Sequence, residues 1–231
     1  MRVIANKMKK AIVLLSSGLD SLVNTAMAIE DGYTVETITF DYGQRAATKE
    51  KEYAARICQF YNIRHTVIDL PWLAAVTATA LVKADKQVPE FDPTRFEDNE
   101  YQQETAKAVW VPNRNGVFIN IAASLAEARQ IRNIIVGFNK EEAATFPDNT
   151  VEYIDKVNEA LAYSTLSKVK VICFTSHMNK REIMNKAKEL SVPLDLCWPC
   201  YHAGDTLCGV CESCVRFKRA KESNDTSKLS H

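Results

Sequence analysis

Short apolar runs of strand length alternate along this chain with longer segments whose apolar residues recur at helical spacing. The first run spans residues 11–15, and a helical pattern over 22–30 follows it after a polar loop. The same alternation then continues along most of the chain. It predicts further strands at 34–40, 65–70, 133–138 and 169–174, and further helices at 46–61, 117–130, 152–163 and 180–190.

Repeated strand–helix units predict an α/β fold. We therefore expect a doubly wound parallel sheet with helices on both faces and a ligand beyond the carboxyl ends of the strands. Residues 82–108 interrupt the alternation, because they are polar, acidic and without a clear period, which fits either a lid or a solvated insertion. The expected organisation is an N-terminal extension at 1–8, the α/β domain at 9–194, a metal-binding lobe with a terminal helix at 195–222, and a polar tail at 223–231.

Composition narrows the class of protein. The 231 residues are 46% hydrophobic and 25% charged, as in an ordinary globular domain. Because 29 basic residues balance 29 acidic ones, no overall positive field draws the chain to nucleic acid, so no direct nucleic-acid partner is expected. The longest purely apolar run has five residues, far short of the ~18 that span a membrane. We expect a cytoplasmic protein with no membrane partner.

Cysteines gather near the C-terminus, where five of the seven lie within residues 197–214. Clustered cysteines at two-residue gaps usually hold a metal in a reducing compartment. Cys200, Cys208, Cys211 and Cys214 would supply four thiolates to a closed structural Zn²⁺ site. An iron–sulfur cluster and redox thiols are the alternatives, and Cys197 competes with Cys200 because the two form a knuckle-like pair.

The polar loop at residues 16–21, Ser-Ser-Gly-Leu-Asp-Ser, follows the first strand and opens the first helix. Free N–H groups and the positive end of a helix dipole suit an anion at that position. A plain N-cap at Asp20 or Ser21 is the simpler alternative. The loop differs from a Walker loop because it lacks the Gly-Lys-Ser/Thr sequence that brings a lysine to the terminal phosphates.

The loop resembles the Ser-Gly-Gly-x-Asp-Ser loop of PP-loop ATP pyrophosphatases, with Ser17 in place of a glycine. Glycine there permits a positive φ and close approach to phosphate, whereas serine is sterically disfavoured but adds a donor. Five further segments extend the resemblance over about residues 9–219. They are Phe-Asp-Tyr-Gly-Gln-Arg at 40–45, Trp-Val-Pro-Asn-Arg-Asn at 110–115, Val-Gly-Phe-Asn at 136–139 with Glu-Glu-Ala at 141–143, Phe-Pro-Asp-Asn at 146–149, and Cys-Tyr-His-Ala-Gly at 200–204 before the three remaining cysteines.

Together these segments resemble the family of 7-cyano-7-deazaguanine synthases, which make a queuosine and archaeosine precursor. The resemblance implies a PP-loop sheet of the adenine nucleotide alpha hydrolase type and a carbon–nitrogen ligase that uses ATP, Mg²⁺ and Zn²⁺. It implies that 7-carboxy-7-deazaguanine and ammonia become the nitrile through an acyl adenylate and an amide, in a homodimer. Alternatives are a ligase that joins the same acid to another amine and stops at the amide, a tRNA-modifying PP-loop enzyme, and a non-enzymatic zinc-binding regulator.

Site residues follow from the matched motifs. The resemblance makes Cys200 the metal ligand in preference to Cys197. It places Asp20, Ser21, Arg114 and Lys180 in catalysis, with Asp20 holding Mg²⁺ or orienting the loop and Lys180 facing the leaving pyrophosphate. Nucleotide binding falls to the loop and the end of the second strand, that is to Leu15, Ser16, Ser17, Gly18, Leu19, Asp20, Ser21, Phe40, Tyr42, Gln44 and Arg45. Substrate binding falls to Glu141, Glu142, Asp148 and Asn149.

Overall fold

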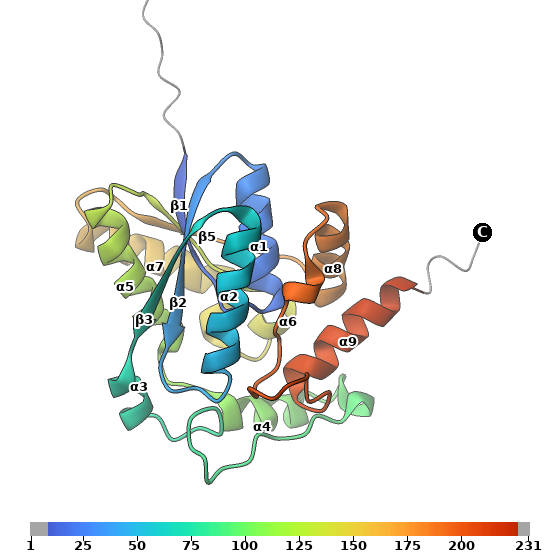
Figure 1. The fold of residues 1–231 in the computed structure, drawn as a ribbon. Coiled ribbons are helices and arrows are strands. Elements are labelled where there is room, and N and C mark those ends of the chain that lie inside the picture. Colours follow the sequence, from blue (N-terminus) through green and yellow to red (C-terminus); the bar gives the residue numbers. More distant parts are fainter. Residues whose placement is uncertain (1–8, 226–231) are drawn as a thin grey trace, which may run out of the picture.

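Five parallel strands form a single sheet in the computed structural model, which describes residues 9–225 (Figure 1). The strand order is β3-β2-β1-β4-β5, so the chain moves outward from β1 to one edge and then returns past β1 to the other. The strands are β1 (Lys10–Leu14), β2 (Thr34–Asp41), β3 (Arg64–Asp69), β4 (Asn133–Ile135) and β5 (Lys170–Ile172). The direction of the order changes between β1 and β4, which is where ligands bind in doubly wound sheets.

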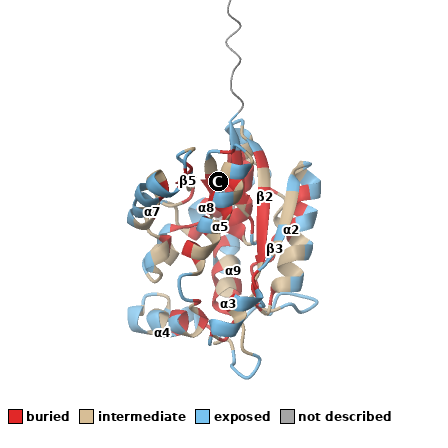
Figure 2. Ribbon diagram, turned by 90° about the vertical axis from the view of Figure 1, so that its left-hand side faces the viewer, coloured by how far each residue is buried: buried red, intermediate tan, exposed pale blue. Residues whose placement is uncertain are grey.

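Helices cover both faces of the sheet (Figures 1 and 2). On one face, α5 (Arg114–Ala128) and α7 (Val151–Ser164) share a core with Ile12 and other strand residues. On the opposite face lie α1 (Leu19–Glu30), α2 (Ala47–Tyr61) and α8 (Lys180–Glu189), packed partly on one another and partly on Val13 and its neighbours. Ile12 and Val13 enter different cores because successive strand residues point to opposite faces.

Further elements complete the described part of the chain. They are α3 (Pro71–Val76), α4 (Asn99–Val109), α6 (Lys140–Ala143), α9 (Glu212–Asp225) and the 3₁₀ turns η1 (Pro93–Arg95), η2 (Pro147–Asn149) and η3 (Leu194–Leu196). No helix within residues 9–225 is long and apolar enough to cross a membrane. The expected N-terminal extension and most of the polar tail lie outside the described residues.

The expected parallel α/β fold is confirmed, with corrections at several boundaries. β4 and β5 end two or three residues before the predicted positions. After Val136, whose N–H still donates to Ile172 O at 3.0 Å, polar side chains bind the backbone groups, as where Phe138 O accepts from Thr175 Oγ1 at 2.6 Å. α1 and α5 each begin three residues earlier than predicted, because their polar first turns carry site residues and hide the apolar period.

Residues 82–108 are more ordered than the sequence indicates. They contain η1 and α4, and Phe91 N donates to Val210 O at 2.8 Å. An isolated antiparallel bridge also pairs Glu90 with Cys211. The segment therefore packs on the C-terminal lobe, which neither the lid nor the solvated insertion anticipates.

Candidate active site

The serine loop lies directly after β1 and leads into α1. Gly18 is the N-cap of α1 and no side chain caps this end, so Asp20 and Ser21 are first-turn residues and the N-cap alternative is wrong for both. Ser21 Oγ donates to Gly18 O at 3.0 Å and lies 3.2 Å from Ser16 Oγ, while Ser16 N approaches Ser21 Oγ at 3.3 Å. Two hydroxyls and a helix N-terminus with no side-chain cap thus meet at one place, which suits a phosphate group.

Ser17 has φ 59°, in the left-handed region. The position therefore requires the conformation that glycine adopts freely, as expected from the resemblance. The Ser17 side chain is fully buried, and its Oγ donates to Ser16 O at 2.6 Å. The extra hydroxyl is consequently used inside the loop, and Ser17 does not line the cavity in front of it.

Lys180, Asp20 and Glu142 form an ionic cluster beside the loop, in which Lys180 and Asp20 are buried and Glu142 is partly exposed. Lys180 Nζ donates to Asp20 Oδ2 and, at 2.7 Å, to Glu142 Oε1. Burial alone would lower the pKa of Lys180, but the two carboxylates outweigh it and hold that pKa above its ordinary value. Burial raises the pKa of Asp20 to about 6, although Lys180 opposes this change.

Asp20 has one oxygen engaged and one free among the described residues. Oδ2 accepts from Lys180 and, at 3.3 Å, from Asn139 Nδ2, whereas Oδ1 is buried without a hydrogen-bond partner. A buried carboxylate oxygen without a donor is costly unless a ligand or water satisfies it. Hard oxygen donors are what Mg²⁺ prefers, so Asp20 fits the expected magnesium ligand.

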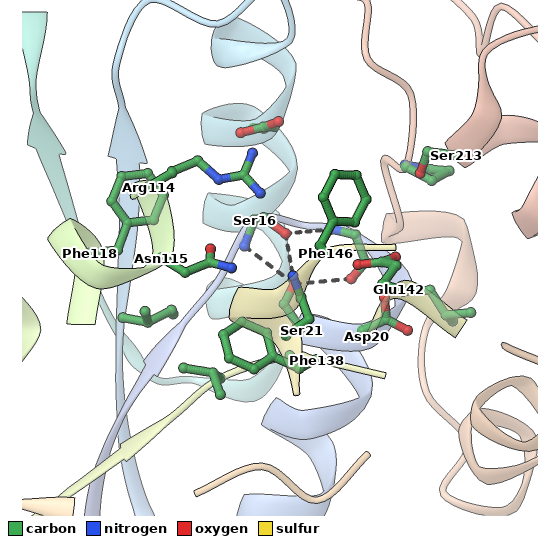
Figure 3. Close-up of a pocket in the computed structure, with 18 of the residues that line it drawn as sticks. Ser16, Asp20, Ser21, Arg114, Asn115, Phe118, Phe138, Glu142, Phe146 and Ser213 are labelled. Carbon is green, nitrogen blue, oxygen red and sulfur yellow. Dashed lines mark hydrogen bonds between the residues drawn. The ribbon is translucent and has the colours of Figure 1, made fainter. Parts of the chain in front are cut away.

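Arg114 lies across the loop from this cluster (Figure 3). Its Nη1 donates to the Tyr42 hydroxyl at 3.3 Å, and Phe118 packs on Tyr42 with 5.7 Å between ring centroids. Burial raises the pKa of Asp148, and the positive charge of Arg114 opposes that rise. The Arg114 cation and the Asp148 carboxyl therefore lie on the same side of the site, where they can bind an anionic or hydrogen-bonding ligand.

These groups surround a cavity of about 250 Å³ at the carboxyl ends of the strands. In Figure 3, Ser16 and Ser21 lie between Arg114 and Phe118 on one side and Asp20 and Glu142 on the other. Most of the residues proposed from the sequence line this cavity. They are Leu15, Ser16, Gly18, Leu19, Asp20, Ser21, Phe40, Tyr42, Arg114, Glu142, Asp148, Asn149 and Lys180.

Besides Ser17, three of the residues predicted to bind nucleotide or substrate do not line the cavity. Gln44 Nε2 donates to Phe40 O at 3.0 Å and to Glu50 Oε2 at 2.8 Å, so it holds the turn after β2. Arg45 donates to backbone carbonyls of residues 80–86, among them Ala80 O at 2.7 Å. Glu141 pairs with Arg216 at 3.0 Å. These three side chains support the site from behind its wall.

Sequence reasoning missed several residues at the cavity. Glu50, Trp110, Phe146 and Glu212 lie in its wall, and Trp110 and Phe146 stack with an interplanar angle of 8°. Burial raises the pKa of Glu50 to about 7. The only sequence signal for Glu50 was its position in the first turn of a helix that follows a site motif. That signal is weak, because the helix dipole ordinarily explains an acidic residue in a first turn.

The four cysteines expected to bind metal come together in the C-terminal lobe. The Sγ atoms of Cys200, Cys208, Cys211 and Cys214 all lie within 4.8 Å of one another, and the Cys208–Cys214 pair is 3.9 Å apart. A tetrahedral zinc with Zn–S bonds of ~2.3 Å requires sulfur atoms ~3.8 Å apart. Cys197 is instead buried in the core between α1 and α8. The donor set therefore fits a closed zinc site that excludes Cys197.

A parallel sheet whose first strand leads through a serine loop into a helix is the architecture expected from the resemblance to PP-loop proteins, and the four-cysteine cluster lies in the C-terminal lobe beside it. The family model of queuosine biosynthesis protein QueC matches residues 10–225. The 7-cyano-7-deazaguanine synthase of Carboxydothermus hydrogenoformans is 49% identical over 94% of this chain and 100% of its own. That of Methanosarcina mazei is 50% identical over 91% and 93%. The chain belongs to the 7-cyano-7-deazaguanine synthase family and is thus an enzyme of the ligase type.

Among solved structures, the NMN synthetase of Francisella tularensis aligns with a TM-score of 0.49 and 15% identity, over 95% of this chain and 77% of that one.

Proposed function

We propose that the protein uses ATP to convert 7-carboxy-7-deazaguanine and ammonia into 7-cyano-7-deazaguanine, through an acyl adenylate and an amide. The observation that carries the proposal is the single cavity that joins the serine loop, the Lys180 cluster and Arg114. Phosphate donors, a site for a divalent cation and a cation for a carboxylate are the three requirements of carboxylate adenylation.

The first step joins the substrate acid to the α-phosphate. In our proposal the backbone N–H groups at Gly18 to Ser21, with the hydroxyls of Ser16 and Ser21, bind the β- and γ-phosphates. Lys180 neutralises negative charge as pyrophosphate leaves, and Asp20 holds Mg²⁺, which when bound would offset further phosphate charge. Arg114 holds the substrate carboxylate against the α-phosphate, since its fork of donors suits either anion.

The second part replaces the activated oxygen by nitrogen. Ammonia attacks the acyl carbon and AMP leaves, which gives the amide. Dehydration to the nitrile requires a second activation, now of the amide oxygen, so the base must stay bound while the nucleotide is exchanged. Glu142, Asp148 and Asn149 line the cavity with acceptors and an amide group that suit the amidine edge of a guanine-like base, and Glu141 supports them.

The proposal also includes Zn²⁺ at the four-cysteine cluster, a homodimeric enzyme and a cytoplasmic location. The cluster geometry supports zinc. Unpaired thiols are stable in a reducing compartment, which supports the cytoplasm.

The decisive experiment is incubation of the purified protein with MgATP, 7-carboxy-7-deazaguanine and ammonium, followed by mass spectrometry and a pyrophosphate assay. We expect the nitrile, with pyrophosphate release that depends on the acid. An amide that never loses water would contradict the nitrile and favour the ligase that joins the acid to another amine. Absence of acid-dependent pyrophosphate release would contradict adenylation itself. The Arg114→Lys variant keeps the charge but loses the bidentate fork, and it is expected to lower the acid-dependent release of pyrophosphate.

A further inference from the structure

Arg216, on α9, connects three separate elements through its guanidinium. Its Nε donates to Glu212 Oε1 at 2.9 Å, its Nη1 to Glu141 Oε2 at 3.0 Å and its Nη2 to Gln102 Oε1 at 2.7 Å. The Arg216 side chain is only 7% exposed. Its Cζ lies 5.6 Å from the ring centroid of Phe91 and 5.4 Å from that of Phe96. The segment at 82–108 therefore packs against the Arg216 side chain.

Glu141 carries this network to Lys180. Its Oε1 accepts from the backbone N–H of Lys180 at 2.8 Å, while its Oε2 binds Arg216. The next residue, Glu142, binds Lys180 Nζ at 2.7 Å. The two adjacent carboxylates of α6 therefore bind both the backbone and the side-chain end of Lys180. Because α6 has only four residues, its position depends on contacts with neighbouring elements.

The same helix that carries Arg216 also carries part of the four-cysteine cluster. Cys211 immediately precedes α9, and Cys214 lies within it. A chain of contacts therefore runs from the cysteine cluster through Arg216 and Glu141 to Lys180. Charge-assisted hydrogen bonds in a water-poor environment are strong and directional, so such a chain can hold a side chain in one place.

We propose that Arg216 is a positioning residue, which acts through Glu141 to hold Lys180 where it meets the nucleotide phosphates. The inference rests on the proposed function for the identity of the ligand. It assigns the inserted segment and the cysteine lobe a part in nucleotide binding, although neither supplies a phosphate donor.

Other roles for Arg216 predict a different dependence of MgATP affinity on Lys180. Arg216 also lines the cavity, so direct contact with the nucleotide is one alternative, and simple support of the lobe is another. A residue that acts through Lys180 loses its effect when Lys180 is absent, whereas a direct contact does not. Non-additivity between two substitutions therefore separates the explanations.

The test compares MgATP affinity by calorimetry in four proteins, namely the wild type, Arg216→Met, Lys180→Met and the double variant. We expect Arg216→Met to weaken MgATP binding about tenfold when Lys180 is present and less than twofold when it is absent. Arg216→Lys is expected to restore part of the loss, because one charge remains but cannot reach three acceptors. Equal losses in both backgrounds, or full affinity in Arg216→Met, would overturn the proposal.

Metal content and melting temperature are measured on each variant as controls. Lys218→Met is the matched control on α9, because Lys218 is 72% exposed and pairs with Glu222 at 3.8 Å. If Arg216→Met does not fold, Glu141→Gln breaks the same chain and leaves α9 intact, and it must show the same non-additivity with Lys180→Met. A wild type that binds no MgATP would refute the proposed function, whereas tight binding with additive losses would refute only the role of Arg216.

Discussion

Gly137 lies against the backbone of Ser21, so closely that a Cβ at Gly137 would be 2.7 Å from Ser21 N and 2.8 Å from Ser21 Cα. Gly137 follows β4 and Ser21 belongs to the first turn of α1. The contact therefore joins the two sides of the point where the strand order reverses. Only glycine allows the serine loop to approach the end of β4 this closely.

Substitution of Gly137 by alanine is expected to displace the serine loop. Because the clashing atoms are backbone, the strain cannot be relieved by a side-chain rotation, and we expect a loss of about 1–3 kcal/mol in unfolding free energy. MgATP affinity should fall as well, and both can be measured by denaturant titration and calorimetry. Gly204→Ala is the control, because the nearest atom to its added Cβ is 3.3 Å away in an exposed loop. Equal behaviour of the two variants would contradict the prediction.

Ser17 should tolerate glycine and reject valine. With φ at 59°, Ser17→Gly removes a conformational penalty and loses only the hydrogen bond to Ser16 O, so stability should change by less than about 1 kcal/mol. Ser17→Val should destabilise by about 1–3 kcal/mol because β-branched residues avoid this region. Melting curves measure both. Since the Ser17 hydroxyl faces away from the cavity, a large loss of MgATP affinity in Ser17→Gly would show that our placement of it is wrong.

Loss of Lys180 should make the stability of the protein strongly dependent on pH. Lys180→Met leaves Asp20 and Glu142 close together without a cation, which should cost about 3–5 kcal/mol near neutral pH. One carboxyl then titrates above its unfolded-state pKa, so the variant regains stability as the pH falls. Denaturant unfolding at pH 5.5 and 8 measures this. Lys186→Met, which removes a partly exposed pair with Glu189, should show no such dependence.

Ionisation of Glu50 should lower the free energy of unfolding as the pH rises. Burial raises the pKa of Glu50 from 4.5 to about 7, so the folded state binds the extra proton between these values. The unfolded state binds fewer protons in that window, and unfolding free energy therefore falls as the pH rises through it. Glu50→Gln should be more stable than the wild type at pH 8, by about 1–3 kcal/mol, and not at pH 4. Chemical denaturation at both values gives the comparison, and a constant difference would refute it.

Cys197 and Cys200 should differ in metal binding although they lie only three positions apart in the sequence. Cys200→Ala removes one of four clustered thiolates and should lower both zinc content and melting temperature. Cys197→Ala changes a buried core position and should keep one zinc per chain, with only a modest packing loss of about 1–2 kcal/mol. Elemental analysis of the two purified variants decides the matter. Loss of metal in Cys197→Ala would show that Cys200 is the wrong fourth ligand.

Periodicity in the sequence determined the class of fold, because strands and helices of an α/β protein bury apolar residues at different spacings. It located all five strands and the long helices on both faces, and it gave the serine loop its place after β1. Spacing alone also located the cysteine cluster. It left the choice between Cys197 and Cys200 open, because both fit a knuckle-like pair.

Tertiary structure decided which residues meet. The sequence separates Asp20 from Lys180 by 160 positions, and no local pattern reports that they pair or that Glu141 and Glu142 bind opposite ends of the lysine. The helix at 99–109 also depended on distant contacts, since its polar residues find Arg216 only in the folded chain. Local spacing reflects burial along one element, whereas pairing and burial of charges depend on which elements the fold brings together.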